Sequence, residues 1–404
     1  MYWDVKHHSA FPQSVAVGNV IFLSGCTGVG KPTPVESQVR TALDKARAAM
    51  ETAGSSMDNI VKTFFFARSL ADYPQVRKTE VEYYLEHAPH LVEHPPAATF
   101  IVATSLAQPD FLIEYEAIGA VDRAAPDWSV KYYPEYWGGR KLAYPHVPKE
   151  HAKFARTEVV GNLVIVSGCQ ALDHDSVKVE TNDFKKQTRI VLEKMKRGME
   201  ETGGSMNNLV KTNVLLDDLG NLPLYREVEQ AYFREHAPDL ARNPPASTVI
   251  VAESLPRPEF LVEVEAFGVV DKTAPNWTTN YTPGSPYASA GVSAGNLLFL
   301  SACDGSNPET GKIETNDVER QIIVALDKVA AALARAGSSM DRVVKTVLML
   351  RRLEDYPKMR KTELAYYEKH APHLVANPPA STFIQLPIIT GPEALFQIDV
   401  TAVL

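Results

Sequence analysis

Residues 344–384 read VKTVLMLRRLEDYPKMRKTELAYYEKHAPHLVANPPASTFI, and the chain contains nearly the same segment twice more. The copy that starts at Val61 reads VKTFFFARSLADYPQVRKTEVEYYLEHAPHLVEHPPAATFI, and the copy that starts at Val210 reads VKTNVLLDDLGNLPLYREVEQAYFREHAPDLARNPPASTVI. The three segments align without gaps, so their lysines and their Pro-Pro pairs keep one spacing. A threefold internal repeat of this kind indicates three copies of one folding unit.

Length and composition are typical of a globular protein with a large core. The chain has 404 residues, of which 45% are hydrophobic and 22% charged, and its formal net charge is −8. An acidic balance argues against a nucleic-acid partner, because phosphate binding needs clustered Lys and Arg. We find no apolar run long enough for a membrane span and no signal-peptide pattern in the first residues, so we expect a cytosolic protein without a membrane partner.

Each copy has the same order of predicted elements. In the third copy, a Gly-Asn turn at Gly295 precedes the apolar strand LLFL, and apolar residues then recur every three or four positions from Val318 to Leu333, which predicts an amphipathic helix. Gly337 follows as a C-cap. The VKT strand comes next, then a second helix that cannot continue through the Pro-Pro pair, and finally two more strands.

This order predicts an α+β unit with a mixed sheet whose one face is covered by two helices. The other face must also be buried, so we expect three units to pack about a pseudo-threefold axis. The boundaries that follow are repeats at 1–121, 151–270 and 285–404, with linkers at 122–150 and 271–284. Both linkers contain A-P-[DN]-W, at Trp128 and Trp277, and we interpret the tryptophans as anchors that hold the linkers to the surface.

Taken together, the motifs resemble the Rid (YjgF) family, the reactive intermediate deaminases. They are the GN-strand-SG opening, the glycine-ended helix, VKT with an apolar strand, EH before Pro-Pro-Ala and the closing I-E-x-E-A-I strand. The resemblance implies chorismate-mutase-like units packed around a central β-barrel, with ligand clefts between units. A trimer fused into one polypeptide would be a monomer, or a dimer of pseudo-trimers paired through the helical faces.

The implied activity is hydrolysis of a small imine or enamine at a C–N bond, without a cofactor. The family's hallmark is an arginine directly after Pro-Ala that grips a substrate carboxylate at two points. This chain has small residues at that substrate-binding position, so we expect an altered substrate and poor turnover of 2-imino acids. The three residues are Ala98, Ser247 and Ser381.

The resemblance also implies an acidic residue on the last strand that activates water, which we assign to Glu116, Glu265 and Asp399. The alternative is a solvent-facing residue of an alternating strand. Tyr287 matches a pocket tyrosine of the family, where the other copies have Phe11 and Phe154, and we expect the cleft with Tyr287 to recognise ligand. The family's pocket Ser-Gly persists as Ser24-Gly25 and Ser167-Gly168 and becomes Ser301-Ala302.

One cysteine follows this pair in each copy, at Cys26, Cys169 and Cys303. A thiolate there is a candidate nucleophile, but a small buried thiol at a strand end fits the position as well. We predict no metal site. The histidines that end the second helices are interpreted as structural caps; they are His87, His236 and His370.

Two other functions stay open. Cyclic amide hydrolases such as barbiturase resemble a three-repeat version of a similar fold with a serine and a lysine in each repeat, which the serines above and Lys62, Lys211 and Lys345 would match. A non-catalytic protein that binds or organises a small ligand would explain the triple loss of the arginine.

Overall fold

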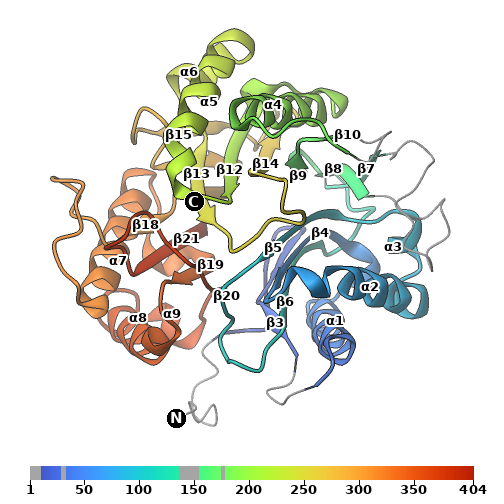
Figure 1. Cartoon of the computed structure of the whole chain (residues 1–404), viewed down its shortest axis with the longest axis horizontal. Helices are drawn as coiled ribbons and strands as arrows, with labels where there is room; N and C mark the ends of the chain where they lie inside the picture. Colours follow the sequence, from blue (N-terminus) through green and yellow to red (C-terminus); the bar gives the residue numbers. More distant parts are fainter. Residues whose placement is uncertain (1–10, 29–32, 127, 136–153, 174–177) are drawn as a thin grey trace.

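The structure is a computed structural model that describes residues 11–28, 33–126, 128–135, 154–173 and 178–404. Within these residues, no helix combines the length and the apolar character needed to cross a membrane. The three repeats form three sectors around a common centre, with helices on the outside and strands within (Figure 1).

Repeat 3 shows the unit most clearly. Its sheet has the order β15-β16-β17-β21-β19-β20, in which only β19 and β20 run parallel. Two long helices cover one face, as predicted: α7 packs a stripe of buried aliphatic residues into the core, and α8 packs Met359, Tyr366 and Tyr367 into it. The elements are β16 (Gly291–Ala294), β17 (Leu297–Leu300), β18 (Cys303–Asp304), α7 (Val318–Arg335), β19 (Val343–Leu350), α8 (Tyr356–His370), α9 (His373–Ala376), β20 (Ala380–Gln385) and β21 (Phe396–Val403).

Repeats 1 and 2 have the same plan. The elements of repeat 1 are β1 (Ser14–Val17), β2 (Val20–Leu23), β3 (Cys26–Thr27), α1 (Val35–Thr52), β4 (Ile60–Ala67), α2 (Tyr73–His87), α3 (His90–Glu93), β5 (Ala97–Val102) and β6 (Ile113–Ala120). Those of repeat 2 are β8 (Phe154–Val160), β9 (Leu163–Gln170), β10 (Leu172–Asp173), β11 (Lys178–Val179), α4 (Phe184–Glu201), β12 (Leu209–Leu216), α5 (Leu222–His236), α6 (Pro238–Arg242), β13 (Ala246–Val251) and β14 (Val262–Val269).

Each linker adds a strand to the repeat that follows it. In the first linker β7 (Val130–Glu135) pairs with β8, and in the second β15 (Thr279–Thr282) pairs with β16. Trp128 and Trp277 meet with their ring centroids 5.1 Å apart, so the linkers are anchored against each other at one end of the axis.

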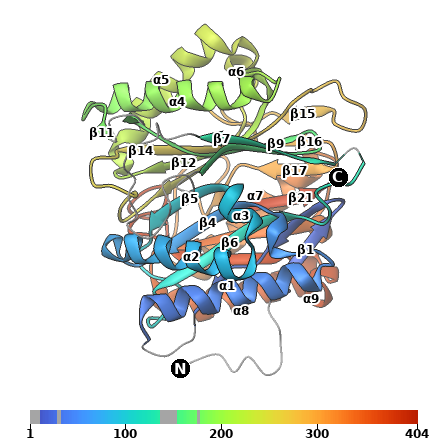
Figure 2. The same cartoon turned by 90° about the vertical axis from the view of Figure 1, so that its right-hand side faces the viewer.

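The sheet faces that the helices leave uncovered pack together from all three repeats, as the sequence predicted. Two apolar clusters along the axis take residues from all three repeats, including Val61, Val210 and Val344 in one of them. Figure 2 shows these strands between the outer helix layers. Burial of this shared apolar surface holds the repeats together.

The expected closed central barrel is wrong. The strands of repeats 1 and 2 form one curled sheet of 12 strands, joined where β5 meets β8 at Ala97 and Ala155, and repeat 3 keeps a separate sheet of 7 strands. Between repeats 1 and 3, the described residues make one isolated bridge, Ser105 with Gln385. The result is a curled half-barrel. A closed barrel needs hydrogen-bonded strand pairing at every boundary between repeats, and the described strands pair only at the boundary between repeats 1 and 2.

Candidate active site at the junctions between repeats

A matching hydrogen bond marks each boundary between repeats. The backbone N–H of the residue after Pro-Pro-Ala or its equivalent donates to a serine hydroxyl on the next repeat. We call the boundaries junction I (Ala98 N to Ser167 Oγ, 3.0 Å), junction II (Ser247 N to Ser301 Oγ, 2.8 Å) and junction III (Ser381 N to Ser24 Oγ, 3.0 Å). The structure therefore brings together the residues that the resemblance assigned to the ligand site.

Each serine is held from both sides. At junction III, Ser24 Oγ also donates to the carbonyl oxygen of Pro12 at 2.6 Å, and the N–H of Gly25 donates to the carbonyl oxygen of Ser381 at 2.9 Å. Ser167 and Ser301 donate in the same way to carbonyls twelve residues earlier. These serines fix the strand ends across the boundary, which suits a positioning role better than a nucleophilic one.

A buried glutamate lies against the glycine at two of the junctions. A Cβ atom placed on Gly25 would come within 1.7 Å of Glu114 Oε1, and one placed on Gly168 within 1.8 Å of Glu263 Oε1. Both glutamates are almost completely buried. Glycine is therefore needed at these positions because the carboxyl group occupies the space that a side chain would take.

Burial raises the pKa of Glu114 and of Glu263 to about 8 in each case. For Glu114, a hydrogen bond from the N–H of Phe383 at 3.3 Å and the charge of Lys345 oppose this rise. A carboxyl group whose pKa lies near neutrality can both donate and accept a proton at physiological pH. Sequence reasoning missed these residues, although they stand only two positions before Glu116 and Glu265.

Junction II departs from this arrangement at both positions. Ala302 replaces the glycine and Gln397 replaces the glutamate, in the same registers of β18 and β21. Gln397 is 3% exposed and its Oε1 has no hydrogen-bond partner among the described residues. The two changes are sterically coupled, since the methyl group of alanine would collide with a carboxyl group placed as in Glu114.

The predicted carboxylates Glu116, Glu265 and Asp399 lie elsewhere, along the pseudo-threefold axis. Each pairs with the lysine of the VKT segment on another repeat: Lys62 with Glu265 (2.6 Å), Lys345 with Glu116 (2.8 Å) and Lys211 with Asp399. These residues line a cavity of about 70 Å³ on the axis.

The ion pair keeps Glu265 charged. Burial acts to raise its pKa, but the charge of Lys62 and hydrogen bonds from Lys62, Thr99 and Asn213 bring the pKa below the ordinary value. A carboxylate that stays ionised is a weaker proton carrier near neutral pH than one with a pKa of about 8. The geometry thus indicates a structural role on the axis.

The lysines do not form the serine–lysine pairs of a cyclic amide hydrolase. The Nζ atoms of Lys62, Lys211 and Lys345 donate to the hydroxyls of Thr99, Thr248 and Thr382. In the parts of the chain that the structure describes, no lysine of this set hydrogen-bonds Ser24, Ser167 or Ser301.

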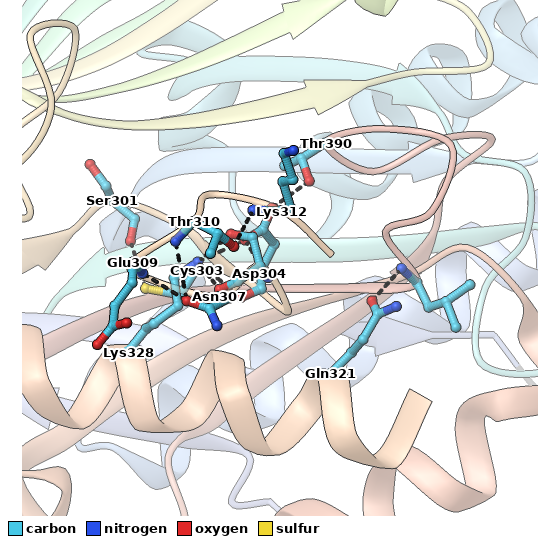
Figure 3. Close-up of polar contacts among 12 residues, drawn as sticks. Ser301, Cys303, Asp304, Asn307, Glu309, Thr310, Lys312, Gln321, Lys328 and Thr390 are labelled. Atoms are coloured by element: carbon cyan, nitrogen blue, oxygen red, sulfur yellow. Dashed lines mark hydrogen bonds and ion pairs between the residues drawn. The ribbon is translucent and has the colours of Figure 1, made fainter. Parts of the chain in front are cut away.

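The three cysteines are buried at the strand ends. Burial raises the pKa of Cys26 to about 12 and that of Cys303 to about 11, so both thiols stay protonated near pH 7. Figure 3 shows Cys303 beside Asp304, which accepts from Lys328 at 2.7 Å and so fixes the following loop onto α7. A protonated, enclosed thiol does not favour the nucleophile alternative.

The predicted aromatic residues differ in their surroundings. Tyr287 is 46% exposed at junction II, whereas Phe11 lies at junction III with its ring 4.7 Å below the guanidinium carbon of Arg360. The side chain of Phe154 lies outside the described residues. Over the described ranges, no three His, Cys, Asp or Glu side chains come together in a way that could hold a metal ion.

Each repeat is similar to known proteins of one family. The family model for Endoribonuclease L-PSP matches residues 4–121, 145–270 and 278–404. A RutC family protein of Pyrococcus abyssi is 33% identical over 119 residues, covering 30% of this chain and 87% of that protein. A 2-iminobutanoate/2-iminopropanoate deaminase of Escherichia coli is 34% identical over 113 residues, covering 27% of this chain and 84% of that protein.

Most of the chain also aligns with a single chain of a solved structure. The crystal structure of a chorismatase aligns with a TM-score of 0.51 at 14% sequence identity, covering 85% of this chain and 93% of that one. At this identity the likeness concerns the fold alone. With the family model matched three times over, the chain belongs to the Rid/YjgF (RutC, L-PSP) family and carries three tandem copies of its domain.

Proposed function

We propose that the protein hydrolyses a C=N bond of a small imine or enamine at junctions I and III, with Glu263 and Glu114 moving the proton. The observation that carries the proposal is the pair of buried carboxyl groups, each beside a Ser-Gly pair and each with its pKa raised to about 8. Relatives named as imine deaminases support the reaction class.

The raised pKa suits both halves of the reaction. The protonated carboxyl donates to the imine nitrogen, which makes the carbon more electrophilic, and the resulting carboxylate then takes a proton from the water that attacks this carbon. Collapse of the carbinolamine forms the C=O bond and breaks the C–N bond. One imine and one water give one carbonyl compound and one ammonia.

Junction III is the more completely described of the two sites. Tyr356 lies within electrostatic range of both Glu114 and Arg360, so α8 of repeat 3 and β6 of repeat 1 face the same space. Ser24, Gly25 and Ser381 border it. The boundary thus offers a proton carrier, aromatic surface and a cation to one small molecule.

The test replaces each proton carrier without changing its size. Glu114→Gln and Glu263→Gln should each remove one working site, and the double variant should lose turnover of a panel of small imines, followed by competition with semicarbazide. Glu116→Gln, two residues along the same strand, is the matched control and should retain turnover. Full turnover by the double variant would refute the proposal, and loss in Glu116→Gln alone would return the role to the axial carboxylates.

A further inference from the structure

Junction II contains a buried arginine that the hydrolysis proposal does not use. Arg226, on α5, has a side chain that is only 11% exposed. Its Nη1 donates to Glu229 Oε2 at 2.7 Å, and its Nη2 donates to Ser247 Oγ at 2.9 Å. The phenol of Tyr287, which is half exposed, lies within electrostatic range of the same guanidinium.

The two acceptors of this guanidinium are unequal. Glu229 is a carboxylate and forms a charge-assisted bond, whereas the Ser247 hydroxyl is a neutral acceptor. Charge-assisted hydrogen bonds are about twice as strong as neutral ones, so a ligand carboxylate would replace the hydroxyl as the stronger partner. If a ligand displaced the Ser247 hydroxyl from Arg226, this hydroxyl would still have a second hydrogen-bond partner, because Thr212 Oγ1 donates to it at 3.3 Å.

The same junction lacks the glutamate that is proposed to transfer the proton at junctions I and III. Gln397 stands where junctions I and III have glutamate, and a side-chain amide does not act as an acid or a base at physiological pH. Its Oε1 is buried and has no hydrogen-bond partner within the described part of the chain, so this oxygen could accept a hydrogen bond from a ligand.

We propose that junction II binds a small carboxylate without hydrolysing it, with Arg226 as the anion contact and Tyr287 at the entrance. The absence of turnover there rests on the proposed function of Glu114 and Glu263, but the binding itself does not. The chain would then combine two hydrolytic junctions with one that only binds a ligand, which three identical subunits could not do.

The experiment reads binding at junction II alone. Tyrosines are labelled with 3-fluorotyrosine, and the resonance of Tyr287 is assigned by its loss in Tyr287→Phe. Pyruvate is the probe and methyl pyruvate, of nearly the same shape without the charge, is its control. Pyruvate should shift this ¹⁹F resonance in a saturable way, and methyl pyruvate should bind at least about tenfold more weakly.

Variants of Ser247 test the proposed contact between Arg226 and the ligand carboxylate. They keep the ion pair of Arg226 with Glu229, which removal of Arg226 would break. Ser247→Asp places an internal carboxylate on the guanidinium and should weaken pyruvate binding at least about tenfold, whereas Ser247→Ala should not weaken it. Ser381→Asp, the equivalent change at junction III, should leave the Tyr287 response unchanged.

The possible outcomes are distinct. A Tyr287 resonance that ignores pyruvate, follows methyl pyruvate equally or still responds in Ser247→Asp would overturn the proposed site. The Glu114→Gln/Glu263→Gln protein should keep the response, so failure of the hydrolysis proposal would show in turnover and not here. Turnover that persists in that double variant and falls on Gln397→Ala would overturn the statement that junction II only binds.

Discussion

Gly25→Ala should disable junction III while leaving the fold intact. The added methyl carbon would stand 1.7 Å from Glu114 Oε1 and 2.6 Å from its carboxyl carbon, so the carboxyl group must leave its place. The N–H of Phe383 then loses its acceptor. An unmade buried hydrogen bond costs about 1–3 kcal/mol, and overpacking of a tight site has a similar cost.

Two measurements check this expectation. Urea denaturation should show that Gly25→Ala lowers the free energy of unfolding by about 1–3 kcal/mol. Imine turnover should fall to that of junction I alone, and Gly25→Ala/Gly168→Ala should match the inactive double glutamine variant. Gly391→Ala is the control, because its methyl group meets nothing within 4 Å.

The comparison with repeat 3 sharpens the test. Ala302 and Gln397 are the natural pair at the same two positions, so Gly25→Ala added to Glu114→Gln should cause no further loss of turnover. If Gly25→Ala keeps both normal stability and normal turnover, the carboxyl group does not occupy the space that the structure gives it, and the assignment of Glu114 fails.

Three further outcomes are expected. Lys211→Met leaves Asp399 without its cation and should lower the free energy of unfolding by about 3–5 kcal/mol in urea, whereas exposed Lys185→Met should change it little. Light scattering should report the mass of one chain, 44.5 kDa, or of two chains paired through helical faces, and a mass of three chains would contradict a self-contained pseudo-trimer. Because the folded-state pKa of Glu114 and Glu263 is raised from 4.5 to about 8, the folded state binds the extra protons between these values, so stability should fall as pH rises from about 5 to 8, and less steeply in Glu114→Gln/Glu263→Gln.

The fold of each unit was predictable because the same local signals for helices, strands and their ends occur in all three repeats. Apolar spacing from Val318 to Leu333, the C-cap at Gly337 and the Pro-Pro stop all describe local structure, which nearby residues determine. Closure of the barrel was not predictable in this way, since it depends on strand register between residues far apart in the chain, such as Ala97 and Ala155.

The site shows a different limit. Glu114 and Glu116 both lie on the face of β6 that looks toward the neighbouring repeat, because side chains two apart share a face. Periodicity therefore cannot tell which carboxyl group meets Gly25 and which meets Lys345. That depends on how far along the strand the next repeat makes its contact, which only the assembled structure contains.

The ion pairs on the axis have a consequence for folding. They connect the repeats in a closed cycle: the lysine of repeat 1 pairs with the carboxylate of repeat 2, that of repeat 2 with repeat 3, and that of repeat 3 with repeat 1. A fragment without repeat 3 would keep Lys211 and Glu116 without the ion-pair partners that they have in the full chain. Unfolding of any one repeat would therefore leave one charged side chain without its ion-pair partner in each of the other two. We expect the three repeats to unfold in a single cooperative transition rather than one at a time.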